Sequence, residues 1–180
     1  ARPVLFPVLA IFDIEDPAPL QEAALRLDGV DWVAFVSPNA VEKALNAILA
    51  LRPWPAGLRV ATVGKSSEQA LAKHGVTDVV APRERFDSEA LLELPELQQM
   101  AGKCVMIFRG DGGRELLGDT LRQRGASVEY VTCYRRGRPA LDPAPLLKLW
   151  SEGRLDAVTV TSSEGLRNLV DMVGKLGQTW

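Results

Sequence analysis

The stretch between residues 102 and 136 constrains the fold most, because it reads as a strand, a turn, a helix and a second strand. Residues 104–108 form an apolar run that is too short for a helix and is typical of a strand buried on both faces. The turn Arg109–Gly113 is rich in glycine, and apolar residues then recur at helical spacing before the β-prone run 128–134. A crossover of this length joins parallel strands, so the stretch predicts a βαβ unit and an α/β fold.

The rest of the chain alternates in the same way. Residues 4–12 are β-prone, but Pro7 interrupts them, which favours an edge strand or an extended linker. The further strands that the apolar runs predict are residues 32–36, 59–63, 77–80 and 157–160. The helices that capping and periodicity predict are residues 16–27, 40–51, 68–73, 89–94, 116–124, 142–150 and 163–173.

Residues 31–45 and 156–169 repeat one pattern: an aspartate, a strand, a hydroxyl-rich turn and an amphipathic helix. The copies lie on either side of the central βαβ unit, and the polar segment 135–139 before the second copy is typical of an interdomain connection. Two similar domains, the second incomplete, would produce the repeat. The alternative is chance similarity between two βα units.

Composition narrows the function classes. A net charge of −2 over 180 residues gives no basic footprint for nucleic acid. No apolar run is long enough to span a bilayer and no leader opens the chain, so we expect a cytoplasmic protein that does not bind a membrane. Cys104 and Cys133 lie in expected buried strands, where a disulfide or two reduced thiols are both open. One histidine and two cysteines argue against a structural zinc site, and His74 is expected near the end of a helix.

The turns that follow the predicted strands are candidate anion sites, because parallel sheets bind ligands where helix N-termini present free N–H groups. The hydroxyl candidates at these turns are Ser37, Ser66, Ser67, Thr161, Ser162 and Ser163. Each hydroxyl could instead serve only as a helix N-cap. The cationic candidates are Lys65, Arg109 and Arg114, with solvated surface charge as the alternative.

Six segments, in order, resemble the uroporphyrinogen-III synthase family. They are residues 35–41 (FVSPNAV), 63–71 (VGKSSEQAL), 86–91 (FDSEAL), 108–116 (FRGDGGREL), 134–136 (YRR) and 161–166 (TSSEGL). The resemblance implies two similar parallel-sheet α/β domains, flanked by helices and joined by a two-strand connector. It implies connector strands at residues 1–12 and 128–138, a complete domain at 13–127 and part of the other, discontinuous domain at 139–180. Members of the family begin before this chain and continue after it, so one domain is expected to be incomplete here.

The resemblance also implies the reaction. The family's substrate is hydroxymethylbilane, which is cyclised to uroporphyrinogen III with loss of water and inversion of ring D. Because the substrate supplies much of the reactivity, the protein must fold it and exclude the uninverted product. The resemblance implies no cofactor and no metal. We expect a monomer with a transient contact to the preceding enzyme of the pathway.

Tyr134 matches the tyrosine that the family places in its cleft, so the resemblance implies a catalytic role. A phenol there could hydrogen-bond the departing hydroxyl and act as a general acid; from sequence alone, a tyrosine at a strand end packs with a polar tip. The substrate-binding residues that the family match adds to the hydroxyls and cations above are Pro38, Asn39, Gly64, Gly110 and Gly112.

The sequence bears on two other function classes. A non-catalytic tetrapyrrole- or anion-binding module of the same fold is the alternative, and turnover of hydroxymethylbilane distinguishes it from the enzyme. A nucleotide-binding domain lacks support because the sequence has no G-x-G-x-x-G motif. Gly64-Lys65-Ser66 ends like a phosphate-binding loop, but no glycine lies five residues before Gly64.

Overall fold

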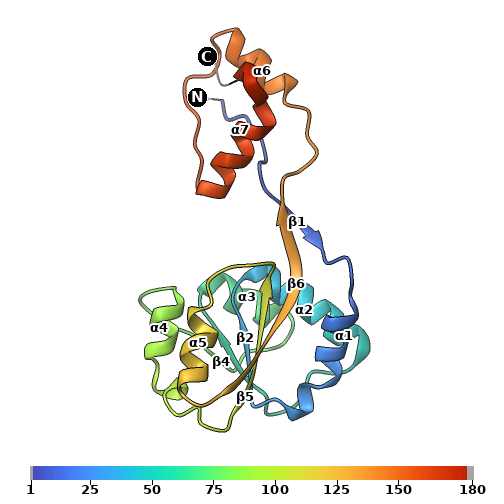
Figure 1. The fold of residues 1–180 in the computed structure, drawn as a ribbon, viewed down its shortest axis with the longest axis vertical. Coiled ribbons are helices and arrows are strands. Elements are labelled where there is room, and N and C mark those ends of the chain that lie inside the picture. The colour runs from blue at the N-terminus through green and yellow to red at the C-terminus, as the bar shows by residue number, and fades with distance from the viewer. Residues whose placement is uncertain (1, 178–180) are drawn as a thin grey trace. The chain divides into compact units, whose positions relative to one another are not determined.

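A computed structural model describes residues 2–177, with side chains as far as residue 174. Contacts within the chain divide it into two compact units. Residues 13–135 form the first unit, and the segments before residue 13 and after residue 135 form the second. Figure 1 shows the sheet with its helices in the first unit, and further helices in the second.

Most of the predicted elements are present. The strands are β1 (Ala10–Asp13), β2 (Trp32–Phe35), β3 (Arg59–Thr62), β4 (Val79–Val80), β5 (Cys104–Gly110) and β6 (Ser127–Gly137). The α-helices are α1 (Ala18–Leu25), α2 (Pro38–Leu51), α3 (Lys65–Lys73), α4 (Ser88–Glu93), α5 (Leu116–Gln123), α6 (Ala144–Ser151) and α7 (Ser163–Gly177). Short 3₁₀ turns lie at Leu27–Gly29 and Pro95–Leu97. The βαβ unit β5–α5–β6 is confirmed.

The strands form one sheet in the order β1-β6-β5-β2-β3-β4. The pairs from β6 to β4 are parallel, as the apolar runs predicted. In β2 every residue is buried, which is why a continuous apolar sequence forms this central strand. Phe35 at the end of β2 pairs with Phe108 of β5 and with Thr62 of β3, so the carboxyl ends of these strands lie at one edge of the sheet.

Helices cover both faces of this sheet (Figure 1). On one face, a buried cluster joins Trp32 and Ile107 of the strands to Leu91 of α4 and Leu121 of α5. Alternate strand residues point to the other face, because strand side chains have a period of two. There Phe35 and Phe108 are fully buried and stack with ring centroids 5.2 Å apart. This double-sided core holds the edge of the sheet that carries the candidate site.

The strand expected as a connector at residues 128–138 lies largely within the sheet, where its neighbours are β1 and β5. β6 pairs with β5 from Ser127 to Tyr134, and both Val131 and Tyr134 are buried. These apolar side chains need the cover of the core, which keeps them in the sheet rather than in a free connection. Only the end of β6 continues past the first unit, and there a Cβ on Gly137 would lie 3.1 Å from the Phe12 ring.

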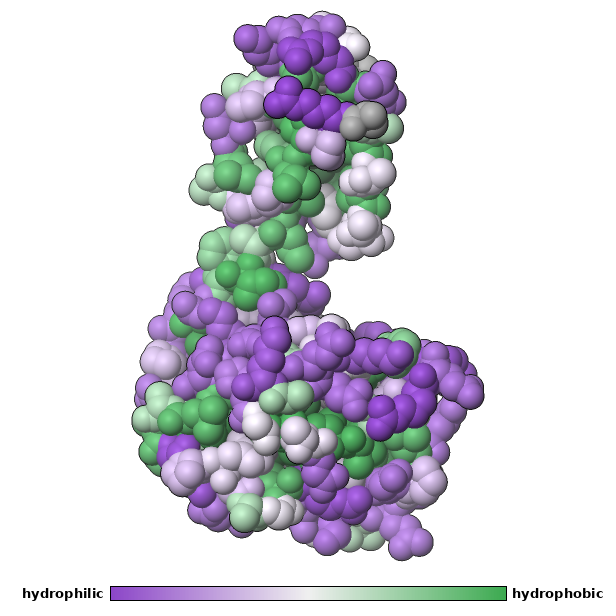
Figure 2. Space-filling model, turned by 180° about the vertical axis from the view of Figure 1, so that it is seen from behind, coloured by the Kyte–Doolittle hydropathy of each residue, from purple (hydrophilic) through white to green (hydrophobic). Residues whose placement is uncertain are grey.

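The second unit has a small core of its own. Leu146 of α6 packs with Leu169 and Val173 of α7, and Phe6 and Val8 lie against them. The Asn168 side chain donates a hydrogen bond to the Val8 carbonyl oxygen at 2.8 Å. This cluster links the first residues of the chain to α7. Figure 2 shows green apolar surface between purple polar groups on this unit.

The predicted buried strand at residues 157–160 is not formed. These residues are exposed and form no strand, and the exposed fraction of Val158 is 49%. A strand requires ladder hydrogen bonds to a neighbour, and no described strand pairs with this segment. The segment therefore has the apolar composition of a strand, but it has no neighbouring strand to pair with among the described residues.

The predictions for the cysteines and for His74 are confirmed in part. Cys104 is exposed, against the prediction of burial, whereas Cys133 is buried, and both thiols are free. His74 ends α3 as predicted, and its Nε2 atom lies 3.1 Å from Glu42 Oε2. Among the helices that the structure describes, none combines the length and the apolar character needed to cross a membrane.

Candidate functional site

The carboxyl ends of β2 and β3 open into a groove of about 520 Å³. The groove is a candidate site because these two parallel strands each turn directly into a helix there. Its lining residues are Val36, Ser37, Pro38, Val63, Gly64, Lys65, Ser66, Ser67, Gln69 and Phe86. Six of them were predicted from the sequence as site or hydroxyl residues, namely Ser37, Pro38, Gly64, Lys65, Ser66 and Ser67.

Ser37 begins α2. Its backbone is extended, and its Oγ atom accepts a hydrogen bond from the Ala40 N–H at 3.1 Å. Pro38 follows at the first helical position, where the missing N–H costs nothing. Asn39 is exposed in the first turn and does not line the groove. The capping role considered for Ser37 is therefore present, and it leaves the other side of its hydroxyl available.

The start of α3 is different, because no side chain caps it. Gly64 is the N-cap residue, and Lys65 and Ser66 are exposed in the first turn. The Lys65 ammonium lies 5.6 Å from the centroid of the Phe86 ring. Backbone N–H groups without a side-chain cap and a nearby ammonium make this helix start suited to a carboxylate.

Tyr134 reaches the same edge of the sheet through an irregularity in β6. Arg109 pairs with Thr132, but Gly110 pairs with Tyr134, so Cys133 is an extra residue in the strand. Such a bulge redirects the side chains that follow it. The Tyr134 side chain is buried, with only 5% of the residue exposed, and its hydroxyl oxygen lies 3.0 Å from Ser37 Oγ. Tyr134 and Ser37, two sequence candidates 97 residues apart, are thus brought into contact.

Gly110 makes this position of the phenol ring possible. A Cβ atom built on Gly110 would lie 2.6 Å from two carbons of the Tyr134 ring. The Tyr134 carbonyl oxygen also accepts a hydrogen bond from the Asp111 N–H at 2.9 Å, which fixes the backbone beside the turn. Gly110 therefore contributes space for Tyr134, and any larger side chain would displace the ring.

The two arginines predicted to bind substrate point to other partners. The Arg109 guanidinium pairs with Glu115 Oε1 at 2.9 Å and lies 4.5 Å from the centroid of the Tyr130 ring. Burial, followed by the Glu115 charge, raises the pKa of Tyr130. Arg109 is 9% exposed and does not line the groove. A buried strand-end arginine with a local carboxylate partner is a packing feature that the sequence did not distinguish from a ligand.

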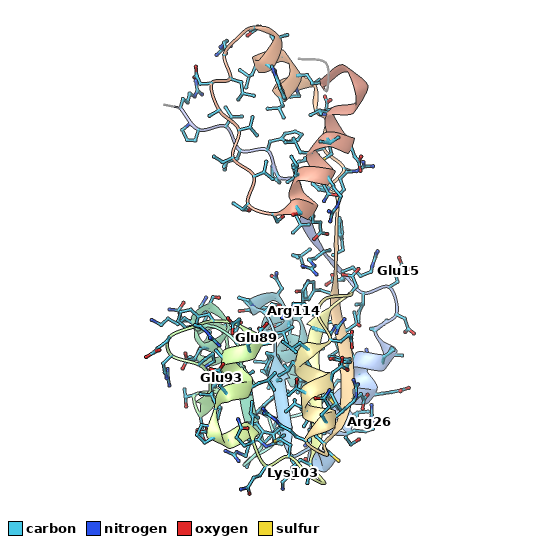
Figure 3. The ribbon with its side chains drawn as sticks, turned by 60° about the vertical axis from the view of Figure 1, so that its left-hand side comes forward. Glu15, Arg26, Glu89, Glu93, Lys103 and Arg114 are labelled. Carbon is cyan, nitrogen blue, oxygen red and sulfur yellow. The ribbon has the colours of Figure 1, made fainter. Side chains whose placement is uncertain are left out.

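Arg114 lies in the exposed turn before α5 and pairs with Glu89 of α4 (Figure 3). The hydrogen bond from Arg114 lowers the pKa of the Glu89 carboxyl. Gly112, in the same turn, has a φ of 72° and is exposed, so it shapes the turn and does not line the groove. The structure does not bring these two candidates together with Ser37.

Cys133 adjoins Tyr134 but is not a second reactive group. Burial raises the pKa of its thiol to about 12. A thiol with this pKa remains protonated at neutral pH and is a poor nucleophile. Its part in the site is to be the extra residue of the bulge.

The last three candidates, Thr161, Ser162 and Ser163, belong to the second unit and precede or begin α7. Ser162 Oγ accepts a hydrogen bond from the Gly165 N–H at 3.0 Å, so it has the capping role. Thr161 and Ser162 also line a groove of about 630 Å³ within this unit. Their contact with a substrate stays a prediction.

Comparisons with known proteins decide the family. The family model described as uroporphyrinogen-III synthase HemD matches residues 1–180. A uroporphyrinogen-III synthase of Salmonella typhimurium is 45% identical over 168 residues, which are 91% of this chain and 67% of that protein. The Escherichia coli K12 synthase is 36% identical over 93% of this chain and 69% of its own length.

This chain belongs to the uroporphyrinogen-III synthase family. Solved structures agree on the fold: a mutant uroporphyrinogen III synthase from the extremely thermophilic bacterium Thermus thermophilus has a TM-score of 0.65 at 24% identity, over 93% of this chain and 66% of that one. The chain thus spans about two thirds of the length of these relatives. The family and the α/β fold that the sequence suggested are both confirmed.

Within this uroporphyrinogen-III synthase fold, some groove residues were not predicted as site residues. Val63, Gln69 and Phe86 line the groove. Phe86 is 48% exposed, and the signal for it in the sequence is its place at the start of the family segment 86–91. Across the described residues, no group of three or more histidine, cysteine, aspartate or glutamate side chains is arranged to hold a metal ion.

Proposed function

We propose that this chain catalyses the cyclisation of hydroxymethylbilane to uroporphyrinogen III, with loss of water and inversion of ring D. The observation that carries the proposal is the match of the family model over residues 1–180. Because water leaves the substrate, the enzyme is a hydro-lyase. The groove at the carboxyl ends of β2 and β3 is consistent with the proposal, since it offers anion-binding groups next to a buried phenol.

In this proposal Tyr134 assists the departure of the substrate hydroxyl. The phenol donates its proton as the carbon–oxygen bond breaks, which releases water and leaves an electrophilic azafulvene system. Ring D attacks through its substituted carbon, and the spiro intermediate fragments and recombines. The hydrogen lost from ring D at closure returns a proton to the phenolate, so the tyrosine is restored and the sum is loss of one water. The short contact to Ser37 supports this role because it shows the phenol held by a polar partner.

The carboxylates of the substrate are proposed to bind at the start of α3. Lys65 supplies charge, and the N–H groups after Gly64 supply hydrogen bonds that no side-chain cap occupies. The Ser66 hydroxyl adds a polar contact at the same groove. Much of the anion contact would thus come from the backbone.

The finer architecture is part of the proposal. Two similar domains joined by connector strands, one of them incomplete in this chain, would account for the division into two compact units and for the shorter length than the relatives. We also propose a cytoplasmic monomer that makes transient contact with the enzyme supplying its substrate. Hydroxymethylbilane closes spontaneously to the I isomer, so a short transit would favour the III isomer.

Turnover is the test. Freshly prepared hydroxymethylbilane is mixed with the chain, and the I and III isomers are separated after oxidation to porphyrins. We expect the III isomer to form faster than spontaneous closure produces the I isomer. A product ratio equal to that of the enzyme-free reaction would contradict the proposal, and saturable substrate binding without turnover would favour the non-catalytic binding module.

The role of Tyr134 is tested by Tyr134→Phe. Losing one general acid should lower kcat by ~10²–10⁴-fold while KM changes little. Tyr130→Phe is the matched control, because Tyr130 is the only other tyrosine and its hydroxyl donates to the Glu115 carbonyl oxygen at 3.1 Å. Ser66→Ala should instead raise KM modestly with kcat retained, because backbone N–H groups keep part of the contact. Full rate and full isomer fidelity in Tyr134→Phe would mean that positioning alone supports the chemistry.

A further inference from the structure

We infer that Ser37 is a positioning residue: its hydroxyl donates to the Tyr134 oxygen and so leaves the phenol hydrogen free for the substrate. This inference rests on the proposed function and changes the role predicted for Ser37, from holding a substrate carboxylate to orienting the tyrosine. Three observations carry it, namely the hydrogen bond at the start of α2, the contact between the two hydroxyls and the space at Gly110.

The hydrogen-bonding capacity of Ser37 limits the arrangement. A serine hydroxyl has one hydrogen to donate and two lone pairs that accept. One lone pair accepts the Ala40 N–H at 3.1 Å, and Tyr134 Oη lies 3.0 Å away on a second contact. The second contact has two possible directions: either the phenol donates to serine, or serine donates to the phenol.

The two directions have opposite consequences for the chemistry. If the phenol donates to Ser37, its only hydrogen is engaged and cannot reach a leaving hydroxyl. If Ser37 donates, the phenol oxygen is held through a lone pair and its hydrogen can point at the substrate. Hydrogen bonds in a chain strengthen one another, so a serine oxygen that accepts the Ala40 N–H becomes a better donor. The proposal requires the order Ala40 to Ser37 to Tyr134 to substrate, because only this order leaves the phenol hydrogen for the leaving hydroxyl.

The ring itself has little freedom to leave this contact. It lies over Gly110 so closely that a Cβ there would be 2.6 Å from two ring carbons, and Tyr134 is 5% exposed. The bulge in β6, which pairs Gly110 with Tyr134, fixes where the ring starts. Because packing holds the ring in place, only the phenol hydrogen can still change direction. The hydrogen bond from Ser37 determines that direction.

Substitutions at Ser37 separate positioning from helix capping. Threonine keeps both the hydroxyl and the cap. Glycine is tolerated at a helix start but has no hydroxyl, and aspartate caps well but only accepts hydrogen bonds. A cap alone predicts that Ser37→Asp is at least as active as Ser37→Thr and Ser37→Gly, because aspartate is the strongest cap of the three. Positioning predicts the kcat order Thr, then Gly, then Asp, because aspartate captures the phenol hydrogen.

We expect kcat of Ser37→Thr within about threefold of the wild type and kcat of Ser37→Gly reduced roughly tenfold, the equivalent of one hydrogen bond. Ser37→Asp should be lower still at saturating substrate. Asn39→Asp adds the same charge in the first turn of α2, and its effect on KM measures repulsion of the anionic substrate. Retention of wild-type kcat by Ser37→Asp would overturn the inference while leaving the proposed function intact.

A second measurement does not depend on activity. The free energies of unfolding are compared for the wild type, Ser37→Gly, Tyr134→Phe and the double variant. If the two hydroxyls bond, the second substitution should destabilise less in the presence of the first. Additive effects would overturn the contact itself. If the wild type shows no turnover, the proposed function and the catalytic part of this inference both fail, and the cycle still decides whether Ser37 holds the phenol.

Discussion

At the scale of single residues, the groups that can bind a substrate are those whose polar atoms are not already hydrogen-bonded or ion-paired within the protein. Ser37 and Tyr134 contact each other across 97 residues of sequence, whereas Arg109 and Arg114 are engaged by Glu115 and Glu89. A charge at a strand end therefore does not by itself indicate a substrate-binding residue, because a neighbouring carboxylate can already engage it. The polar groups that stay available at the groove are mainly the first turn of α3 and the Lys65 ammonium.

Gly110→Ala tests this close packing. The added Cβ would meet the Tyr134 ring at 2.6 Å, so either the ring or the strand must shift. Overpacking of this kind destabilises by about 1–3 kcal/mol, and displacing the phenol should also lower kcat. Gly29→Ala is the matched control, since a Cβ on Gly29 would have no atom within 4 Å. Chemical denaturation and turnover measure both effects, and a Gly110→Ala protein as stable and active as Gly29→Ala would show that the ring adapts freely.

At the scale of elements, sequence pattern and structure agree where an element is defined by its own residues. The apolar runs identified β2, β3 and β5, and periodicity identified α2 and the other long helices. The sequence pattern could not predict which strands pair with each other or in which register. The bulge at Cys133 depends on how β6 aligns with β5, and residues 157–160 have strand composition without a partner. The contact between Ser37 and Tyr134 could not be predicted from the sequence for the same reason, because it depends on the register between β6 and β5.

The attachment of α1 to the sheet gives a prediction with a pH dependence. Arg26, directly after α1, donates two hydrogen bonds to Glu129 of β6, at 2.8 and 2.6 Å. These bonds lower the pKa of Glu129 below its ordinary value of 4.5. A lowered pKa means that the pair stabilises the fold above pH 4.5 and that this contribution is lost as pH falls through the folded-state value.

Glu129→Gln should therefore destabilise the protein at pH 7 and have no effect in acid. Both side chains are about half exposed, so the loss at pH 7 should not exceed about 1 kcal/mol. Urea unfolding of both proteins at several pH values measures the difference, with Glu96→Gln as a control at an exposed glutamate. A difference that stays constant down to the acid end would exclude the ion pair as its source.

At the scale of the whole molecule, the two compact units have different amounts of core. In the first, a sheet is covered on both faces and its central strands are buried. In the second, the described residues form a smaller cluster, in which Leu146, Leu169 and Val173 are buried, and it holds α6, α7 and an extended segment together. Buried apolar contacts oppose local opening, so stability should not be uniform along the chain.

Hydrogen exchange tests this difference. Amide hydrogens of residues 157–160 are expected to exchange nearly as fast as those of an unfolded peptide, because the segment is exposed and pairs with no described strand. Amide hydrogens in residues 32–35 lie in a fully buried strand between β5 and β3, so they should exchange only on global opening of that unit. Mass spectrometry of peptic fragments resolves the two segments, and repeating it at several protein concentrations shows whether copies pair through this segment. Equally slow exchange in both at every concentration would mean that residues 157–160 are protected within the chain, and that the apolar pattern there forms a stable strand in solution after all.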